Sequence, residues 1–218
     1  FTRARVQWAL TLGLTQLAVA EGRRFLAQGA GDLDDRLFLA EGLLRAKQFG
    51  AARDLLEETR LLQGDEERVL VQLGHAWLGL AHPLTAAGFF ARAAALHDPK
   101  YGRDAAEVLR LHGRPHAALR ANGQVVDQKA KLRQRLALLL DLERFEALTA
   151  LAPRLSRLGL LAEDEDLRFA LAYGFFRLGR FDEAEDQLKR LTRAELFERA
   201  GAMRQAMAEC RRAPERCP

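Results

Sequence analysis

The sequence predicts an all-α protein that is a stack of helical hairpins. Small and aromatic residues recur with a period of about thirty-four residues, the length of one helix–turn–helix repeat. Leu, Ala, Arg and Glu are abundant, while Pro (6 residues), Tyr (2 residues) and the β-branched residues are few, so the chain favours helix almost throughout. Because 49% of the 218 residues are hydrophobic, the chain can bury a core without a metal or a disulfide.

A short turn motif marks the middle of each predicted hairpin. At Phe49–Ala52 a bulky residue closes the turn and a small residue follows it in the second helix. The clearest further copy is Leu178–Ala184. Weaker copies lie at Ala81–Ala86, Gly113–Ala118 and Glu143–Leu148. Each copy predicts that two antiparallel helices meet at that point.

The helices on either side of these turns carry matching residues. The first helix of a hairpin has a small or apolar pair with a bulky residue one turn later, and the second helix has a small residue. Small residues let helices approach closely, so we interpret these positions as core rather than functional. The pairs are Leu39-Ala40, Leu73-Gly74 and Leu171-Ala172; the bulky residues are Leu43, Trp77, Leu109, Leu139 and Phe175; the small residues are Ala52, Ala86, Ala118 and Ala184.

The motif divides the chain into successive repeats of one array, 1–218. The predicted repeats cover 1–32, 33–66, 67–98, 99–128, 129–164 and 165–193, and a terminal helix covers 194–212. We expect a distortion near 120–135, because Asn122-Gly123 is a turn signal and Arg135 stands where an apolar residue is expected. The pattern is already under way at the first residue, so we expect the chain to be a fragment of a longer array.

These positions resemble the tetratricopeptide repeat (TPR), and the resemblance covers nearly the whole chain. It implies a right-handed superhelical solenoid in which the first helices of successive hairpins line a concave groove that binds a partner. Carried over to this sequence, the candidate partner-binding residues are Glu41, His75, Arg103, Arg110, Arg133, Phe169, Tyr173 and Phe176. We expect the aromatic residues to anchor a protein partner and the arginines to favour an acidic peptide or an anionic polymer. Packing between hairpins is the alternative for the aromatic residues, and a solvated helix face is the alternative for the arginines.

Some TPR domains hold chaperone tails in a carboxylate clamp made of a Lys, two Asn and further basic residues on adjacent first helices. The corresponding faces here carry Glu41, His75 and Glu107. The resemblance therefore does not extend to chaperone-tail binding.

The residue patterns of known catalytic and cofactor sites are absent from the sequence. It contains no phosphate-binding glycine loop, no dinucleotide fingerprint and no nucleophile elbow. His112 and His116 are separated by Gly113 and Pro115, which place them on a turn rather than on one helix face. We therefore expect no enzymatic activity, no cofactor and no metal site. The sequence also contains no run of eighteen apolar residues, so it predicts no membrane span.

The two cysteines, Cys210 and Cys217, lie close together at the C-terminal end. If they form a disulfide, they imply an oxidising compartment such as a bacterial periplasm. Two free thiols are the alternative, and they would fit a cytoplasmic location equally well.

The leading functional hypothesis is a non-catalytic TPR scaffold that binds another protein in a multiprotein assembly. The chain resembles the periplasmic TPR region of bacterial exopolysaccharide export proteins, which implies an envelope enzyme or a secretion component as partner and a periplasmic location. The alternative is direct binding of an anionic polymer, polysaccharide or RNA, through a basic groove. Nucleic acid is not expected, because 34 basic residues are nearly balanced by 30 acidic ones and no repeated base-contacting pairs occur.

Overall fold

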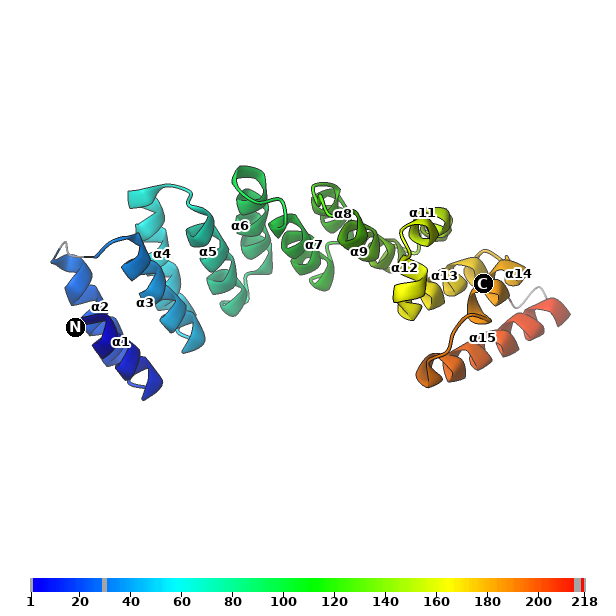
Figure 1. Ribbon diagram of the computed structural model, residues 1–218, viewed down its shortest axis with the longest axis horizontal. Coiled ribbons are helices and arrows are strands. Elements are labelled where there is room, and N and C mark those ends of the chain that lie inside the picture. Colours follow the sequence, from blue (N-terminus) through cyan, green and yellow to red (C-terminus); the bar gives the residue numbers. More distant parts are fainter. Residues whose placement is uncertain (1, 29–30, 214–216, 218) are drawn as a thin grey trace. The chain divides into compact units, whose positions relative to one another are not determined.

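The computed structural model describes residues 2–28, 31–213 and 217, and every regular element in this part of the chain is an α-helix (Figure 1). The predicted all-α fold class is therefore confirmed. The chain divides into two compact units, residues 1–126 and 127–218. The boundary between them lies inside the segment 120–135 in which the sequence predicts a distortion.

The first unit is a stack of antiparallel helix pairs. Each odd-numbered helix packs against the helix that follows it, and α3 packs against both α1 and α5. Its helices are α1 (Thr2–Thr11), α2 (Thr15–Ala27), α3 (Leu33–Arg45), α4 (Phe49–Gln63), α5 (Glu67–Gly79), α6 (Pro83–Leu96), α7 (Tyr101–Leu111) and α8 (Pro115–Gly123). The core of this unit lies between successive pairs, where Leu43, Leu56 and Leu73 are buried.

The second unit begins with a less regular hairpin. Its helices are α9 (Gln128–Asp141), α10 (Phe145–Thr149), α11 (Ala152–Arg157), α12 (Leu160–Glu163), α13 (Glu165–Arg177), α14 (Phe181–Leu188) and α15 (Ala194–Arg212). Three short helices follow α9, because Pro153 lacks the N–H that would continue α10 and Gly159, with φ 74°, separates α11 from α12. Helix α15 packs on both α13 and α14.

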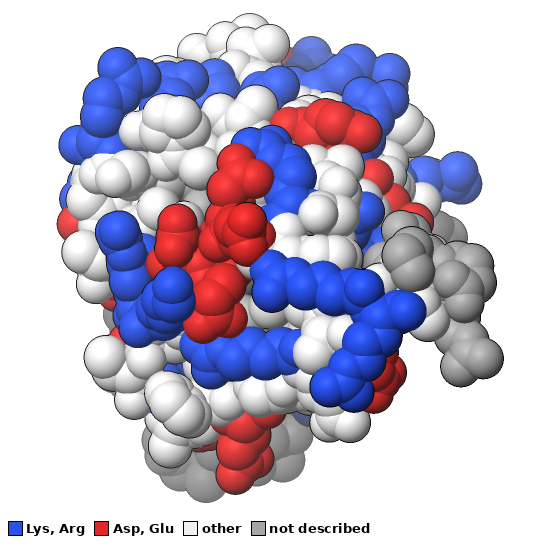
Figure 2. All heavy atoms as spheres, turned by 90° about the vertical axis from the view of Figure 1, so that its right-hand side faces the viewer, with Lys and Arg blue, Asp and Glu red and all other residues white. Residues whose placement is uncertain are grey.

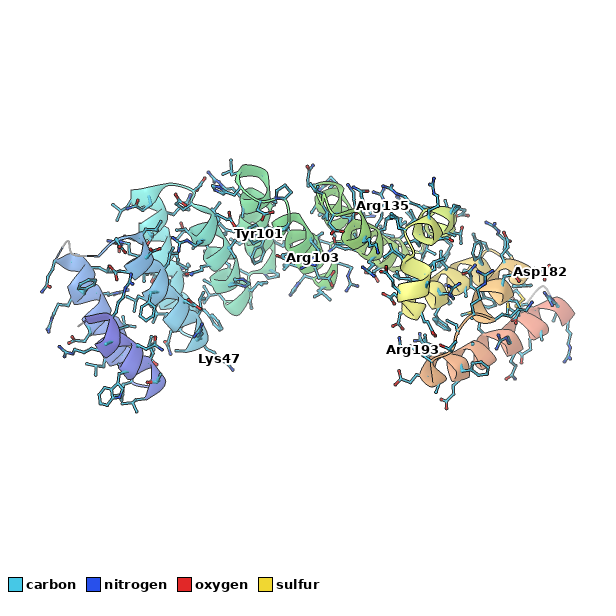
Figure 3. All side chains as sticks on the ribbon, viewed as in Figure 1. Lys47, Tyr101, Arg103, Arg135, Asp182 and Arg193 are labelled. Carbon is cyan, nitrogen blue, oxygen red and sulfur yellow. A yellow bond between two sulfur atoms is a disulfide. The ribbon has the colours of Figure 1, made fainter. Side chains whose placement is uncertain are left out.

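The same backbone turn joins the helices of each pair. In the third pair, the N–H of His82 donates to the carbonyl of Trp77 (2.9 Å) and the N–H of Ala81 donates to the carbonyl of Leu78 (3.0 Å). These two bonds form a Schellman motif, which requires one residue with a left-handed backbone. That residue is Gly13, Lys47 (Figure 3), Ala81, Gly113, Glu143 or Gly179 in successive pairs, with φ between 52° and 71°.

The residue after the left-handed position caps the second helix. The carbonyl of His82, for example, accepts the N–H of Ala86 at 3.1 Å. The position of Ala86 is taken in the other pairs by Ala18, Ala52, Ala118, Leu148 and Ala184, all fully buried. Alanine therefore recurs in the sequence because the two helices cross closely here. Where Leu148 replaces it, helix α13 presents Gly174, and a Cβ atom on Gly174 would lie only 2.6 Å from Leu148 Cδ2.

Charged side chains occupy many of the solvent-facing helix positions. On the face that Figure 2 displays, basic and acidic side chains are interspersed. Many form ion pairs one turn apart on a single helix, as Glu41 does with Arg45 and Glu107 with Arg110. Such exposed pairs stabilise a helix by only about 0.2–0.5 kcal/mol each, so the buried apolar seams hold the stack together.

The left-handed turn positions make opposite predictions for alanine and glycine. We expect Ala81→Gly to stabilise the first unit by about 0.5–1 kcal/mol, because a left-handed backbone costs an L-residue more than glycine loses in unfolded-state entropy. The reverse change, Gly113→Ala, should destabilise the same unit. The measurement is urea unfolding of each variant followed by circular dichroism. A destabilised Ala81→Gly variant would contradict the left-handed backbone conformation of Ala81.

Candidate functional site

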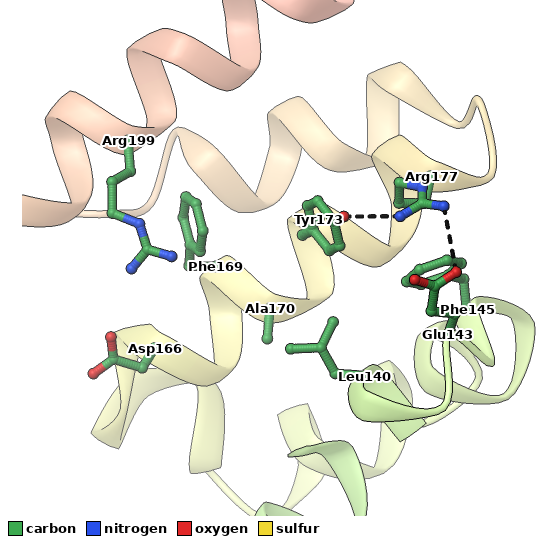
Figure 4. Close-up of a pocket in the computed structure, with 9 residues that line it drawn as sticks. All are labelled: Leu140, Glu143, Phe145, Asp166, Phe169, Ala170, Tyr173, Arg177 and Arg199. Atoms are coloured by element: carbon green, nitrogen blue, oxygen red, sulfur yellow. Dashed lines mark hydrogen bonds and ion pairs between the residues drawn. The ribbon is translucent and has the colours of Figure 1, made fainter. Parts of the chain in front are cut away.

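A pocket of about 450 Å³ lies in the second unit, between the end of α9, the start of α10, α13 and α15 (Figure 4). Its lining residues are Leu140, Glu143, Phe145, Asp166, Phe169, Ala170, Tyr173, Arg177 and Arg199. All of them belong to residues 127–218, so the pocket is a feature of one compact unit.

Helix α13 forms one wall of the pocket. Its contribution comes from Asp166, Phe169, Ala170, Tyr173 and Arg177, which the helical repeat places on a single face. Ala170 is the small member of this set. Ala170 lies nine residues before the left-handed Gly179. The equivalent residue of α3 is Phe38, nine residues before the left-handed Lys47. An alanine at this position leaves open space where a larger side chain would lie.

Arg177 is held firmly at one end of the pocket. Its guanidinium lies over the buried Phe145 ring, 4.6 Å from the centroid, and donates a hydrogen bond to the Tyr173 hydroxyl at 2.9 Å. Glu143 adds an ion pair at 3.7 Å. The Phe145 and Tyr173 rings meet edge to face, with centroids 5.9 Å apart. These contacts leave Arg177 little freedom to reorient.

Arg199 lies at the other end, on α15. Its guanidinium lies over the Phe169 ring, 4.3 Å from the centroid (Figure 4). Asp166, on the same side of the pocket, pairs with Arg193 at 2.5 Å rather than with Arg199. Within the described residues, no carboxylate lies within ion-pair distance of Arg199. Arg199 is therefore a cation of the pocket lining that has no ion-pair partner among the described residues.

Glu165 attaches the start of α15 to α13 and so places Arg199. Its carboxylate accepts hydrogen bonds from the backbone N–H groups of Thr192 (2.9 Å) and Arg193 (3.0 Å), and from the Thr192 hydroxyl at 2.5 Å. These donors, the Thr192 hydroxyl first, lower the pKa of Glu165 to about 2. The bonds hold the backbone of Thr192 and Arg193, the two residues that precede α15.

The sequence-predicted aromatic residues divide between the pocket and the packing beside it. Phe169 and Tyr173 are half-buried and line the pocket. Phe176 does not line it; its ring lies between those of Tyr173 and Phe181, at centroid distances of 6.3 and 6.0 Å. Sequence reasoning missed Arg177 and Arg199. Arg177 continues the spacing of Phe169 and Tyr173 along one face of α13, and this signal was available in the sequence.

The three predicted groove arginines all have acidic neighbours. Arg103 (Figure 3) and Arg110 lie on α7 in the first unit, whereas Arg133 lies on α9 in the second. Their ion pairs are Arg103 with Asp104 at 3.7 Å, Arg110 with Glu107 at 2.6 Å and Arg133 with Glu163 at 3.0 Å. The three arginines therefore do not form one site within either unit.

Glu41 and His75 lie on α3 and α5 of the first unit. Glu41 is exposed and pairs with Arg45 at 2.5 Å. His75 is exposed, and its ring and that of Phe90 are arranged edge to face at a centroid distance of 5.2 Å. Burial lowers the pKa of His75 below its ordinary value, although Asp104 acts in the opposite direction. The ring is therefore neutral at neutral pH.

The two cysteines are joined. Cys210, buried on α15, forms a disulfide with Cys217 across a Cα–Cα distance of 5.4 Å. Elsewhere in residues 2–28 and 31–213, no group of three or more His, Cys, Asp and Glu side chains is arranged to hold a metal ion. Nor does any helix in those segments combine the length and apolar character needed to cross a bilayer.

Comparison with known proteins finds no matching family model and no matching curated protein. Several solved structures are distantly similar, among them the following three. MamA AMB-1, in its C2221 form, is 17% identical with a TM-score of 0.44, over 86% of this chain and 93% of that one. MamA MSR-1 is 16% identical with a TM-score of 0.45, over 94% and 95%. A thermophilic TPR protein of Thermus thermophilus is 19% identical with a TM-score of 0.40, over 91% and 98%. Likenesses at this level identify neither a family nor a function for the chain.

The anchoring of α15 by Glu165 has a defined pH dependence. The pKa of Glu165 is about 2 in the folded chain and 4.5 ordinarily, so the unfolded state binds the proton more readily. Its stabilising contribution is complete above pH 4.5 and is lost as the pH falls towards 2. Glu165→Gln should therefore lower the melting temperature of the second unit more at pH 6 than at pH 3.

The control for this experiment is Glu198→Gln, at an exposed position of α15 outside the pocket. It should change the melting temperature little at either pH. A Glu165→Gln effect of equal size at pH 6 and pH 3 would show that the carboxylate charge does not anchor α15.

Proposed function

We propose that the chain is a non-catalytic interaction scaffold whose second unit docks a segment of a partner protein in the pocket beside α13. The observation that carries the proposal is the pocket itself, in which Phe169 and Tyr173 present half-buried rings beside an apolar floor of Ala170 and Leu140. Its volume of about 450 Å³ falls within the usual range of ligand pockets. Tyrosine and arginine are also the side chains most often found at the energetic centre of protein interfaces.

The pocket is built for binding with little rearrangement. Its walls come from helices, and its charged side chains are stacked on aromatic rings or hydrogen-bonded. Side chains that are already ordered lose little conformational entropy when a partner binds. These contacts support a role in recognition.

The narrower form of the proposal places the scaffold in a bacterial envelope assembly for exopolysaccharide export. Two observations support it. The repeat positions resemble those of such proteins, and the Cys210–Cys217 disulfide is a bond that persists in oxidising compartments. An envelope enzyme or a secretion component would then be the partner.

Binding of an anionic polymer through Arg103, Arg110 and Arg133 remains the alternative prediction. Nothing in the geometry favours it over a protein partner. Each of the three arginines has a nearby carboxylate that offsets its charge, and they are divided between the two units.

Filling the pocket should abolish partner binding. Ala170→Leu adds a branched side chain to the apolar floor, so a docked segment loses its space while the charges at both ends of the pocket stay in place. The measurement is affinity capture from a lysate of the source organism, with each retained protein identified and then purified for a binding titration against the wild-type chain and the variant. A partner of the pocket should bind the wild-type chain and be lost with Ala170→Leu.

The matched control is Ala202→Leu, the same change at an exposed position of α15 that does not line the pocket. Both variants should keep the helical circular dichroism of the parent. If every captured protein binds Ala170→Leu and Ala202→Leu equally well, the pocket is not the docking site.

The envelope form of the proposal predicts the state of the cysteines. Protein isolated from its own cells without reductant should contain no reactive thiol, because Cys210 and Cys217 are bonded to each other. A thiol titration under denaturing conditions measures this directly, with a reduced sample as the reference. Two reactive thiols in the unreduced sample would contradict a location in an oxidising compartment.

A further inference from the structure

The charges that line the pocket are not balanced internally. Arg177 has Glu143 at 3.7 Å and the Tyr173 hydroxyl at 2.9 Å, and the Asp166 carboxylate is occupied by Arg193, which lies outside the pocket lining. Arg199 has no carboxylate within ion-pair distance in the described part of the chain. The one charge left for a ligand to neutralise is therefore positive.

The hydrogen-bond donors of Arg199 have no partner among the described residues. Its guanidinium lies over the Phe169 ring, 4.3 Å from the centroid, and this contact positions the group without a counter-charge. The N–H donors of a guanidinium form a planar fork that can give two parallel bonds to a carboxylate.

The floor between the two arginines is apolar. Figure 4 shows Ala170 and Leu140 between the end that holds Arg199 and the end that holds Arg177. An aliphatic side chain placed there would lose its contact with water, and this burial of apolar surface favours binding. The site thus presents an apolar surface next to a cation.

The aromatic rings favour a peptide over a carbohydrate. A sugar binds to an aromatic ring by stacking on its face, but Arg199 covers a face of Phe169 and Arg177 covers a face of Phe145. Tyr173 and Phe145 meet edge to face, and the Tyr173 hydroxyl accepts a hydrogen bond from Arg177. Because these rings are engaged with guanidinium groups, a sugar would find little free ring face on which to stack.

We infer that the pocket binds a peptide segment of a partner protein in which an Asp or Glu stands next to a Leu, Ile, Val or Met. The acidic side chain pairs with Arg199 and the aliphatic one lies on Ala170 and Leu140. This inference rests on the proposed function, because it names the chemistry of the segment that the scaffold docks.

A random peptide library tests both halves of this recognition. A phage-displayed dodecapeptide library is panned on the full chain, and binders that also bind Ala170→Leu are removed. The remaining peptides should be enriched in an acidic residue beside an aliphatic one. A synthetic peptide from this set is then compared with its amide form, in which Glu becomes Gln or Asp becomes Asn.

Affinities for the wild-type chain and Arg199→Gln complete the experiment. We expect the acidic peptide to bind Arg199→Gln about tenfold more weakly than wild type, as for loss of a charge-assisted pair. The amide peptide should bind both forms equally. Arg212→Gln, an exposed arginine of α15 that does not line the pocket, is the matched control and should bind the acidic peptide like wild type.

The possible failures can be told apart. Peptides that need Ala170 but carry no acidic residue, and that bind Arg199→Gln like wild type, would overturn the inference and leave the scaffold proposal intact. A library with no peptide that depends on Ala170 would overturn both. If polygalacturonate binds instead and is lost with Arg199→Gln, the ligand is an acidic polysaccharide and the peptide inference is wrong.

Discussion

The two-residue turn between paired helices is the constraint on which the rest of the structure depends. One residue must take a left-handed backbone and the next must cap the second helix, so the two helices leave the turn antiparallel and already in contact. A buried alanine in the first turn of the second helix then lets the pair pack closely. Because backbone hydrogen bonds make the turn, Lys47, Ala81 and Glu143 can occupy the left-handed position that glycine occupies in the other pairs.

The hairpin that begins with α9 departs from this scheme, and the pocket lies beside it. Leu148 takes the place of the usual alanine, and Gly174 on α13 provides the space that Leu148 needs. Pro153 then interrupts the second helix, so short helices replace one long one. In a repeat array, identical hairpins would present identical surfaces, so recognition depends on the positions at which one hairpin differs from the others.

The electrostatic character of the pocket depends on which arginines have a carboxylate partner and not on the number of charged residues. Many arginines of this chain have a carboxylate neighbour, so a surface rich in arginine has little net positive potential of its own. Arg199 differs, because Glu165 positions the helix that carries it and Phe169 supports its guanidinium. A single uncompensated cation next to an apolar floor is a more selective feature than a basic stripe.

The sequence by itself determined the helices, their turns and most of the buried alanines, because each is set by residues within one or two helical turns. It also placed Phe169 and Tyr173 on one face of α13, and the same spacing extends to Arg177. Tertiary structure decided that Arg199 stacks on Phe169, that Phe176 turns towards Phe181, and that Arg133 pairs with Glu163 from a different helix. These contacts join residues distant in the chain, and they depend on how helices pack against one another. Helical periodicity specifies which face of a helix is buried but not which residue of another helix will meet it.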